Sequence, residues 1–483
     1  MYKLINNILT KFGKCFKRDS TFNYFVIAVV GLLLRRDTRG ISSIISTLRL
    51  KPQCYDNLVH FFRSTAFELS DLAKTWIGIV LETATLLTVD DRPVLIGDNI
   101  KVAKEAQRMP GVKKLHQDSE NSGKSEYIFG HNHGVVGILA KAGPQLVCIP
   151  VMSEIQDGIR QIENLAKQVA ATKENEPAKD SIVSRMVNLA AKIVLHIGKP
   201  SFLVLDAYFS TKVAFETAAK AIDSQGKSLL TLIVRAKSNF VAFTQPPEVT
   251  VKRRGRPRKY GEQIRFKESF AAWAERFNKA EVVLYGKKET IQYLCLDLLW
   301  KPLGRIVRFV LVKHGSTPFI LMCSDLNVSA LQIIELYGYR FKVEVTFKSL
   351  KQTLGSFFYH FWTTALPKLS RKITETDLSQ VTDSKDKQHI VAAAKAIDVF
   401  VFIGCVAMGI LQMIALQYPA NVWRCFTGWL RTKKHGVTSV ETVRSALQED
   451  ALWNFGKLRK FSTLQLIHQL QRESLYLYEE DIS

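Results

Sequence analysis

Hydrophobic positions recur every three or four residues at both ends of the chain, and this rhythm changes in the middle. The spacing is that of helices with one buried face, so it predicts a helical N-terminal domain over residues 1–89 and a helical C-terminal domain over residues 390–483. The N-terminal segment carries 12 basic residues against 6 acidic ones. A compact basic helical unit is typical of a DNA-binding domain, and a helical cap on the next domain is the alternative.

Short apolar runs alternate with helical segments from residue 90 to residue 239. Two of these runs, VLIGDNIKV and SFLVLDAYF, read as strands that end in an aspartate, Asp98 and Asp206. Strands that alternate with helices predict an α/β domain, in which a mixed sheet is flanked by helices.

A second change of pattern occurs near residue 240. Residues 240–328 contain several alternating apolar runs, which predict a β-rich domain inserted into the chain. Residues 329–356 read as one helix that ends near Gly355. Residues 357–389 are first aromatic and then polar, and predict a linker loop.

The charge of the chain points to a polyanionic partner. The 483 residues include 67 Lys and Arg against 44 Asp and Glu, a formal net charge of +23. Such an excess favours nucleic acid or an anionic membrane surface. The 7 cysteines are scattered and form no C-x-x-C pair, which argues against a disulfide framework and a structural zinc site and suits a reducing cytosol.

One apolar run is long enough to cross a membrane. Residues 399–418 are uncharged over 20 positions, although Gln412 and Gln417 interrupt them. We favour a buried helix and expect no membrane contact, with a basic membrane protein as the alternative. The N-terminus shows no cleavable signal pattern, so we expect a cytoplasmic, nucleoid-associated protein.

The two aspartates form a candidate metal site. If their strands are neighbours, the carboxylates face each other, and one takes up a proton unless a cation lies between them. Mg²⁺ prefers such oxygen ligands. A third carboxylate, Glu344 on the helix that follows the β-rich block, would complete a site for two ions that cleaves phosphodiester bonds. The alternative is that each aspartate only caps a turn or a helix.

A polar stripe surrounds that glutamate. Tyr337, Arg340, Glu344 and Lys351 are spaced by three, four and seven residues, so they project from one side of a helix. Arg340 and Lys351 can hold phosphates, and Tyr337 can bond a phosphate or stack on a base. The alternative is a solvated face with an Arg340–Glu344 ion pair.

The same four residues resemble the Y-R-E-K signature of a family of DDE transposases from insertion sequences. The resemblance implies an RNase H-like catalytic core in which Asp98, Asp206 and Glu344 bind two Mg²⁺ ions, with Mn²⁺ as a substitute. It further implies cleavage and transfer of DNA strands at terminal inverted repeats. The partners would be double-stranded DNA, both element ends and target, and a second protomer in a homodimer, with the C-terminal helices as a candidate dimerisation domain.

Residues 240–328 resemble the insertion domain of that family. In relatives, an aromatic side chain at the start of its last strand stacks on a base flipped out of the duplex. Phe319 stands at that place here instead of tryptophan, and Trp300 is the second candidate. Phe341 also replaces a tryptophan that relatives often have. The alternative is that Phe319 and Trp300 are core aromatics of a β domain.

Other basic residues are candidate DNA contacts. Arg254 and Arg256 lie in a basic loop whose RGRP sequence resembles a minor-groove hook, although a grip on phosphates is the favoured interpretation. Arg235 and Lys237 follow a predicted strand and are candidates for backbone contacts.

An H-x-H pair, His131 and His133, suggests metal ligands or an active-site contact. Alternate residues of any strand share a face, however, so the spacing alone is weak.

Two further functions stay open at this point. One is an RNase H-like nuclease without strand transfer, and the other is an inactive, transposase-derived protein that only binds DNA.

Overall fold

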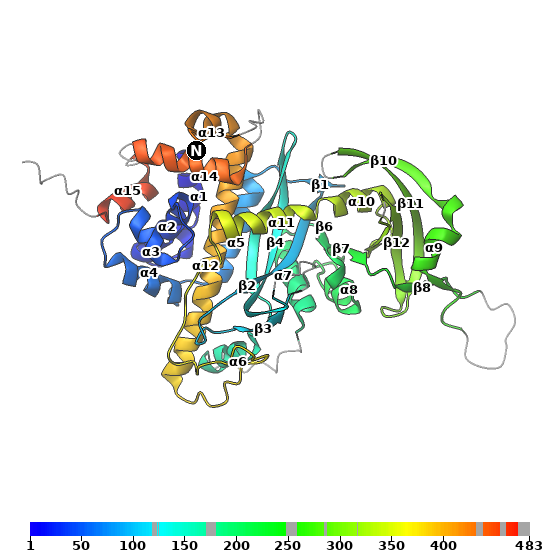
Figure 1. Ribbon diagram of the computed structural model, residues 1–483, viewed down its shortest axis with the longest axis horizontal. Helices are drawn as coiled ribbons and strands as arrows, with labels where there is room; N and C mark the ends of the chain where they lie inside the picture. The colour runs from blue at the N-terminus through cyan, green and yellow to red at the C-terminus, as the bar shows by residue number, and fades with distance from the viewer. Residues whose placement is uncertain are drawn as a thin grey trace, which may run out of the picture.

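The computed structural model describes most of the chain (Figure 1). The described residues are 1–117, 123, 125–170, 180–247, 258–284, 287–315, 317–430, 438–454 and 460–471.

Thirteen strands of the described residues join into one sheet, ordered β3-β4-β2-β6-β7-β13-β12-β11-β8-β9, with β5 beside β4, β1 beside β2 and β10 beside β11. Strands β2, β6 and β7 run parallel, whereas the other pairs are antiparallel. The predicted mixed sheet is therefore confirmed. The strands are β1 Thr88–Val89, β2 Arg92–Ala103, β3 Lys113–His116, β4 Tyr127–Ala142, β5 Gln145–Ile155, β6 Ser201–Leu205, β7 Leu230–Ala236, β8 Val241–Phe243, β9 Gln263–Arg265, β10 Asn278–Leu284, β11 Lys287–Trp300, β12 Arg305–Lys313 and β13 Phe319–Cys323.

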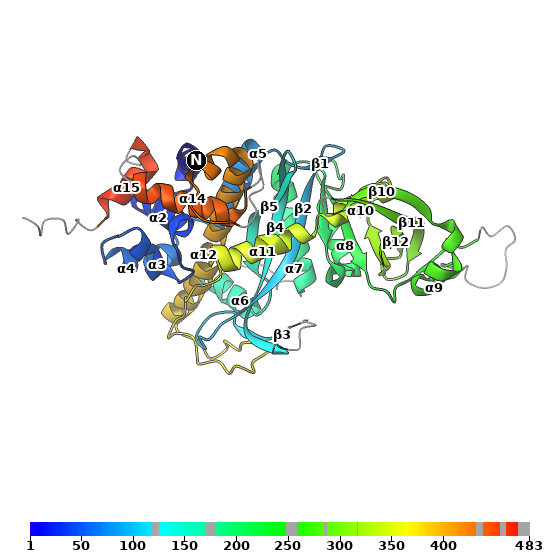
Figure 2. The same cartoon turned by 45° about the horizontal axis from the view of Figure 1, so that its top comes forward.

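Helices cover the sheet and build a separate layer at one end of the molecule (Figures 1 and 2). They are α1 Tyr2–Lys11, α2 Asp19–Leu34, α3 Ile41–Thr47, α4 Cys54–Arg63, α5 Leu69–Thr83, α6 Arg160–Val169, α7 Ile182–Ile197, α8 Lys212–Ala218, α9 Phe266–Ala272, α10 Ala330–Gly338, α11 Phe341–Lys348, α12 Ser384–Gln417, α13 Pro419–Cys425, α14 Val440–Asn454 and α15 Ser462–Gln469.

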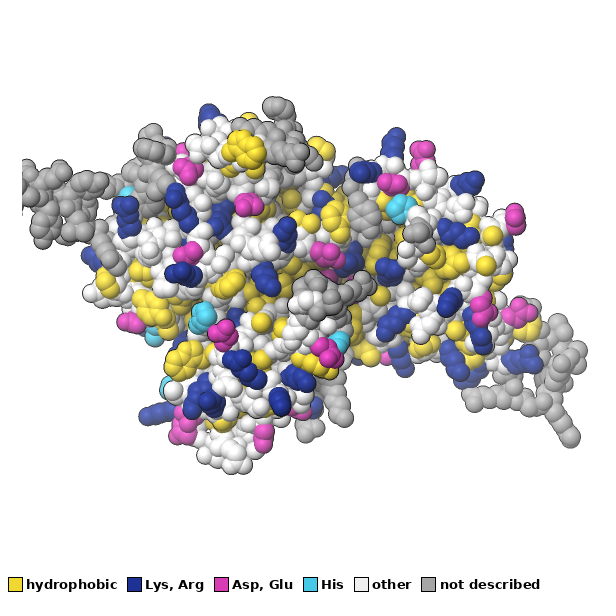
Figure 3. All heavy atoms as spheres, viewed as in Figure 1, with side chains coloured by type: hydrophobic (Ala, Val, Ile, Leu, Met, Phe, Trp, Pro, Cys, Tyr) yellow, Lys and Arg dark blue, Asp and Glu magenta, His cyan; other side chains and the backbone are white. Residues whose placement is uncertain are grey.

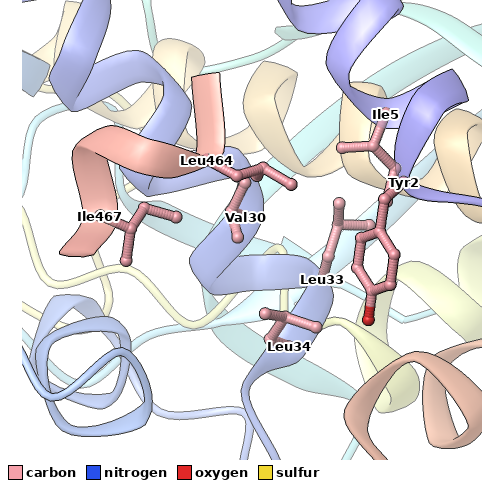
Figure 4. A pocket seen from close by; sticks show the side chains of 7 residues that line it. All are labelled: Tyr2, Ile5, Val30, Leu33, Leu34, Leu464 and Ile467. Atoms are coloured by element: carbon pink, nitrogen blue, oxygen red, sulfur yellow. The ribbon is translucent and has the colours of Figure 1, made fainter. Parts of the chain in front are cut away.

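The helices from the two ends of the chain share one core. Helices α12 and α14 pack on α2, and α1 packs on α15. Figure 4 shows the meeting point, a small apolar pocket between α1, α2 and α15. Its wall consists of Tyr2, Ile5, Val30, Leu33, Leu34, Leu464 and Ile467. The N-terminal and C-terminal helices, which come from opposite ends of the chain, thus form a single helical body.

Helix α12 runs through the molecule and packs against the edge strand β5. By length and composition this helix could cross a membrane, but its apolar window is 100% buried inside the protein. Two side chains cover the open edge of β5, because the carbonyl oxygen of Cys148 accepts from Thr346 Oγ1 at 2.9 Å and from Gln412 Nε2 at 2.9 Å. A sheet edge that would otherwise expose unpaired carbonyls is satisfied from within the core.

The β-rich block continues the core sheet. Its last strand, β13, pairs with β7 of the α/β region, with Ile320 opposite Ala236 and Cys323 opposite Ile233. The change of sequence pattern near residue 240 is therefore a change from buried parallel strands to antiparallel strands within the same sheet.

The segment 329–356 is not the single helix that its spacing predicts. Helix α10 ends at Gly338, α11 begins at Phe341, and a π-helical turn follows over Ser349–Thr353. At the junction the hydrogen bonds tighten to three residues: Tyr339 N–H reaches Leu336 O, and Arg340 N–H reaches Tyr337 O. Glycine and aromatic residues are weak helix formers, which allows the break here.

The predicted linker is shorter than expected, because α12 begins at Ser384 rather than near residue 390. The side chain of Asp383 caps this helix by accepting from the N–H groups of Lys385 and Asp386. Residues 355–369, which we name the strap, form no regular helix or strand. Buried and exposed side chains alternate from Phe357 to Thr364, and Phe357, Tyr359 and Phe361 are buried.

The strap is fastened to β4 by a buried hydrogen-bond chain. Tyr359 Oη lies 2.7 Å from His131 Nδ1 and 2.7 Å from His133 Nε2. His131 Nε2 lies 2.8 Å from the carbonyl oxygen of Pro110, which can only accept, so this nitrogen carries the proton. Tyr359 must then donate to His131 and accept from His133.

The H-x-H pair is therefore part of the scaffold. Both histidines are fully buried, and burial lowers the pKa of His131 to about 3. Their bonded nitrogens are directed at Tyr359 and Pro110, which leaves them unsuited to the metal pair or active-site contact considered from the sequence.

Tyr359→Phe is expected to lower the free energy of unfolding by about 1–3 kcal/mol, because both histidines would lose their shared partner inside the core. Urea unfolding of the full chain measures the change. Tyr55→Phe, at a tyrosine that is 45% exposed, is the matched control and should leave stability unaltered. Equal stability of Tyr359→Phe and wild type would show that the chain of hydrogen bonds does not hold the strap.

Candidate active site

Asp98 and Asp206 lie side by side because their strands pair in parallel. Val94 lies opposite Phe202 and Ile96 opposite Val204, so the same register brings the two aspartates to one level. Contrary to the sequence prediction, Asp98 does not end its strand, since β2 continues to Ala103 alongside β4. What changes at Asp98 is burial: the strand is buried from position 93 to 97 and half-buried from Asp98 to Lys101.

Asp206 directly follows the last residue of β6. Its Oδ1 accepts from Tyr208 N–H at 3.0 Å and thereby caps a short 3₁₀ turn. The capping role considered as an alternative is real for this residue, and it fixes the carboxylate at the strand end. Asp98 Oδ1 similarly accepts from Asn99 N–H at 2.7 Å.

Glu344 reaches the site from helix α11, which crosses the sheet and contacts β2 and β5 (Figures 1 and 2). Val343 and Phe347 are buried beneath the helix, whereas the Glu344 side chain is 56% exposed. Adjacent residues of a strand face opposite ways. Gly97 faces Met186 of α7 on the other side, so Asp98 faces the α11 side.

Arg340 joins the helix to the sheet. Its Nη1 lies 3.1 Å from Asp98 Oδ2, and its Nη2 pairs with Glu344 Oε1. The Arg340 side chain is only 20% exposed. The spacing in the sequence predicts the Arg340–Glu344 pair as part of a solvated helix face. Nothing in the sequence indicates the pair with Asp98, which lies 242 positions away.

Burial and crowded charge control the protonation of this site. Burial raises the pKa of Asp98 to about 7, and the neighbouring charge of Asp206 adds to the rise, while Arg340 opposes it. Burial also raises the pKa of Asp206, again against Arg340. Two carboxylates held this close are stabilised by a cation, and Arg340 supplies one.

The carboxylate oxygens of the site suit a hard divalent cation, but they are not arranged to coordinate one. In the described part of the chain, no three His, Cys, Asp or Glu side chains are arranged to hold a metal ion. Asp98, Asp206 and Glu344 offer carboxylate oxygens, which Mg²⁺ prefers. The guanidinium of Arg340 engages two of these three carboxylates instead.

Burial lowers the pKa of the Arg340 guanidinium, whereas Tyr337, Asp98 and Glu344 raise it. Tyr337, near the end of α10, therefore borders this cluster. It lines a small cavity of about 60 Å³ together with Arg235 and Phe319. The rings of Tyr337 and Phe319 are 6.4 Å apart, and the Arg235 guanidinium lies 5.8 Å from the Phe319 ring. Phe319 is the first residue of β13, as the sequence predicted.

Trp300 is not available to a ligand in this structure. The side chain is 4% exposed and packs on Phe215, with ring centroids 5.5 Å apart, and on Phe240 at 5.7 Å. Its expected role in contacting DNA is therefore replaced by a role in the core. Phe319 is the aromatic of the two that lines a cavity.

The remaining predicted contacts are spread out. Lys351 is exposed but lies in the π-helical turn, so the offset of seven from Glu344 no longer puts it on the same face. Arg235 and Lys237 are exposed at the end of β7. Arg254 and Arg256 lie outside the described residues. Figure 3 shows Lys and Arg side chains distributed over both ends of the visible face rather than in one patch.

One family model matches this sequence. The model of the family described as DDE superfamily endonuclease matches residues 11–282, which is 272 of the 483 residues. The matched segment contains Asp98 and Asp206 and ends before Glu344. No curated protein matches the sequence.

Asp98→Asn is expected to stabilise the protein in metal-free buffer above pH 7. Because the folded-state pKa of Asp98 is raised from 3.8 to about 7, its contribution to stability is full below pH 3.8 and is lost as the pH rises to about 7. The neutral amide avoids this loss. The gain is at most about 4 kcal/mol, since one pKa step corresponds to about 1.4 kcal/mol.

Urea unfolding at several pH values in the presence of a chelator measures the difference between variant and wild type. Asp71→Asn, at an exposed aspartate of α5, is the control and should change the free energy of unfolding much less than Asp98→Asn does above pH 7. A difference for Asp98→Asn that is the same at all pH values would contradict the assignment of a raised pKa.

Proposed function

We propose a specific reaction for this chain, which belongs to the family of DDE superfamily endonucleases. Membership makes the chain an enzyme that acts on phosphodiester bonds in DNA. The proposed reaction is DNA transposition: cleavage and transfer of strands at the terminal inverted repeats of an insertion sequence. The observation that carries the proposal is the convergence of Asp98 and Asp206, at one level of neighbouring strands, with Glu344 joined to them through Arg340.

The three carboxylates would hold two divalent ions, Mg²⁺ or Mn²⁺, within an RNase H-like core. When bound, such ions activate a water or a 3′-hydroxyl and stabilise the leaving oxygen. The protein contributes rigidity, because β2 and β6 are buried strands and the Asp206 carboxylate is fixed by its turn. Glu344 is the most exposed of the three carboxylates, with 56% of its side chain open to solvent.

The substrate strand would pass along α10 and α11. Arg340 can hold a phosphate with both of its terminal nitrogens. Beyond it, the cavity of Tyr337, Phe319 and Arg235 offers two rings and a cation, which suits a base turned out of the duplex and its phosphate. Lys237 and Lys351 are exposed and would add backbone contacts, which makes binding dependent on salt.

The helical body is assigned by layout to recognition of the element ends and to pairing of two protomers. Transposition needs two ends held together, so we propose a homodimer on DNA in the cytoplasm, associated with the nucleoid. A nuclease without strand transfer shares the same site and is distinguished by the products of the reaction.

Glu344→Gln is expected to reduce strand cleavage about 100-fold or more, since it removes a charge that stabilises the transition state through bound metal. The substrate is the DNA that flanks the protein's own reading frame, incubated with the purified full chain and Mg²⁺. Wild type should nick at two matching inverted ends. Glu216→Gln, on the exposed face of α8, is the matched control and should cleave like wild type.

The products separate the alternatives. Nicks at the two ends that Glu344→Gln abolishes, followed by joining to a second duplex, support transposition. Scattered cleavage without joining would replace it with a nuclease, and binding without cleavage by wild type would replace it with a DNA-binding protein.

Phe319→Ala is expected to slow the step that follows the first nick by about 5- to 150-fold, because base–aromatic stacking contributes about 1–3 kcal/mol. A duplex with 2-aminopurine next to the cleaved bond reports base flipping as a rise in fluorescence, and a denaturing gel reports the products. Lys313→Ala, on the neighbouring strand β12 outside the cavity, serves as the control. An unchanged fluorescence rise in Phe319→Ala would remove this ring from the proposed role.

A further inference from the structure

The position of Arg340 has a consequence for when the site can take up metal. Its guanidinium engages Asp98 Oδ2 and Glu344 Oε1, one oxygen of each carboxylate. Asp98 and Arg340 are 17% and 20% exposed, so this contact is shielded from water. A shielded ion pair of this kind is held more firmly than the surface pairs of the protein.

We propose that Arg340 is a latch, which holds Asp98 and Glu344 in the free protein and releases them to metal when a DNA phosphate takes the arginine. The proposal rests on the function proposed above and adds an order of events to it: DNA first, then metal. Arg340 acts in this as a positioning residue.

Competition between two cations is the physical basis. Arg340 and a divalent ion need lone pairs of the same two carboxylates, and like charges at this separation repel. A metal ion therefore binds these two carboxylates more tightly after the guanidinium has moved away. A largely buried guanidinium does not leave without another anion, because an unpaired buried charge is destabilising.

A phosphate of the DNA backbone is the anion of the right shape and place. A guanidinium fork binds phosphate in the same bidentate manner as it binds carboxylate. Arg340 stands at the junction of α10 and α11, with the cavity of Tyr337 on the preceding helix and Glu344 one turn further along the next. A strand that follows these helices passes Arg340 on its way to the carboxylates.

Glu344 can pair either with Arg340 or with a metal ion. Its side chain is more than half exposed and pairs with Arg340, in contrast to Asp206, whose carboxylate caps a turn. Loss of the arginine frees Glu344 to turn toward Asp98 and Asp206. Linkage then requires that DNA and metal strengthen each other's binding by the same factor.

The first test measures binding of Mn²⁺ to the full chain without DNA, from the electron paramagnetic resonance signal of the free ion. Arg340→Gln removes the latch and should bind Mn²⁺ about 5- to 150-fold more tightly than wild type, the usual range of coupling between two sites. Arg340→Lys keeps the charge without the fork and should gain less. Lys212→Gln, which removes one exposed charge on α8, should bind like wild type.

The double variant Asp98→Asn, Arg340→Gln tests whether the additional Mn²⁺ affinity comes from the carboxylate cluster. If it does, the double variant should lose the tighter binding of Mn²⁺. A gain that survives in the double variant would place the ion elsewhere and overturn the proposal, and so would wild-type affinity in Arg340→Gln.

A second arm adds saturating amounts of a short DNA duplex. Wild type should bind Mn²⁺ more tightly with the duplex than without it, and Arg340→Gln should show little further gain. A wild-type affinity that DNA does not alter would overturn the proposal. If wild type cleaves DNA and Glu344→Gln does not, but Arg340→Gln binds Mn²⁺ no more tightly than wild type, the latch is refuted and the proposed function stands. Failure of wild type to cleave refutes the proposed function, whatever Mn²⁺ does.

Discussion

The parallel pairing of β2 with β6 is the constraint on which the site depends. Both strands are buried as far as the level of Gly97 and Leu205, and the next positions carry Asp98 and Asp206. Since parallel strands in register bring equivalent positions to one level, the two carboxylates must share a small space at the limit of the core. Burial raises the pKa of Asp98 to about 7, and the repulsion from Asp206 adds to the rise.

The positive charge of Arg340 offsets this repulsion, and its contact with Asp98 connects helix α11 to strand β2. Arg340 lies in the short turn between α10 and α11. Tyr337, before the break, faces Phe319 and Arg235, while Glu344, after it, faces the aspartates.

The rest of the molecule keeps these parts in place. Helix α12 closes the edge of β5 through Gln412, and Thr346 of α11 bonds the same carbonyl, so the helix that bears Glu344 is fixed to the helical body. The strap is fastened to β4 by Tyr359 on the face that also carries Asp98. The scaffold around the site is therefore rigid, and Glu344 and Arg340 are the members that can change partner.

The sequence by itself predicted the class of the fold, because alternation of strands and helices is local, and it indicated Asp98, Asp206 and Glu344 as candidate site residues. Only the tertiary structure decided what lies between them. The bond from Arg340 to Asp98 spans 242 positions, and the burial of Trp300 and of the H-x-H pair depends on segments far away in sequence. Spacing along a chain reports which residues share a face, whereas partners across the core are set by packing.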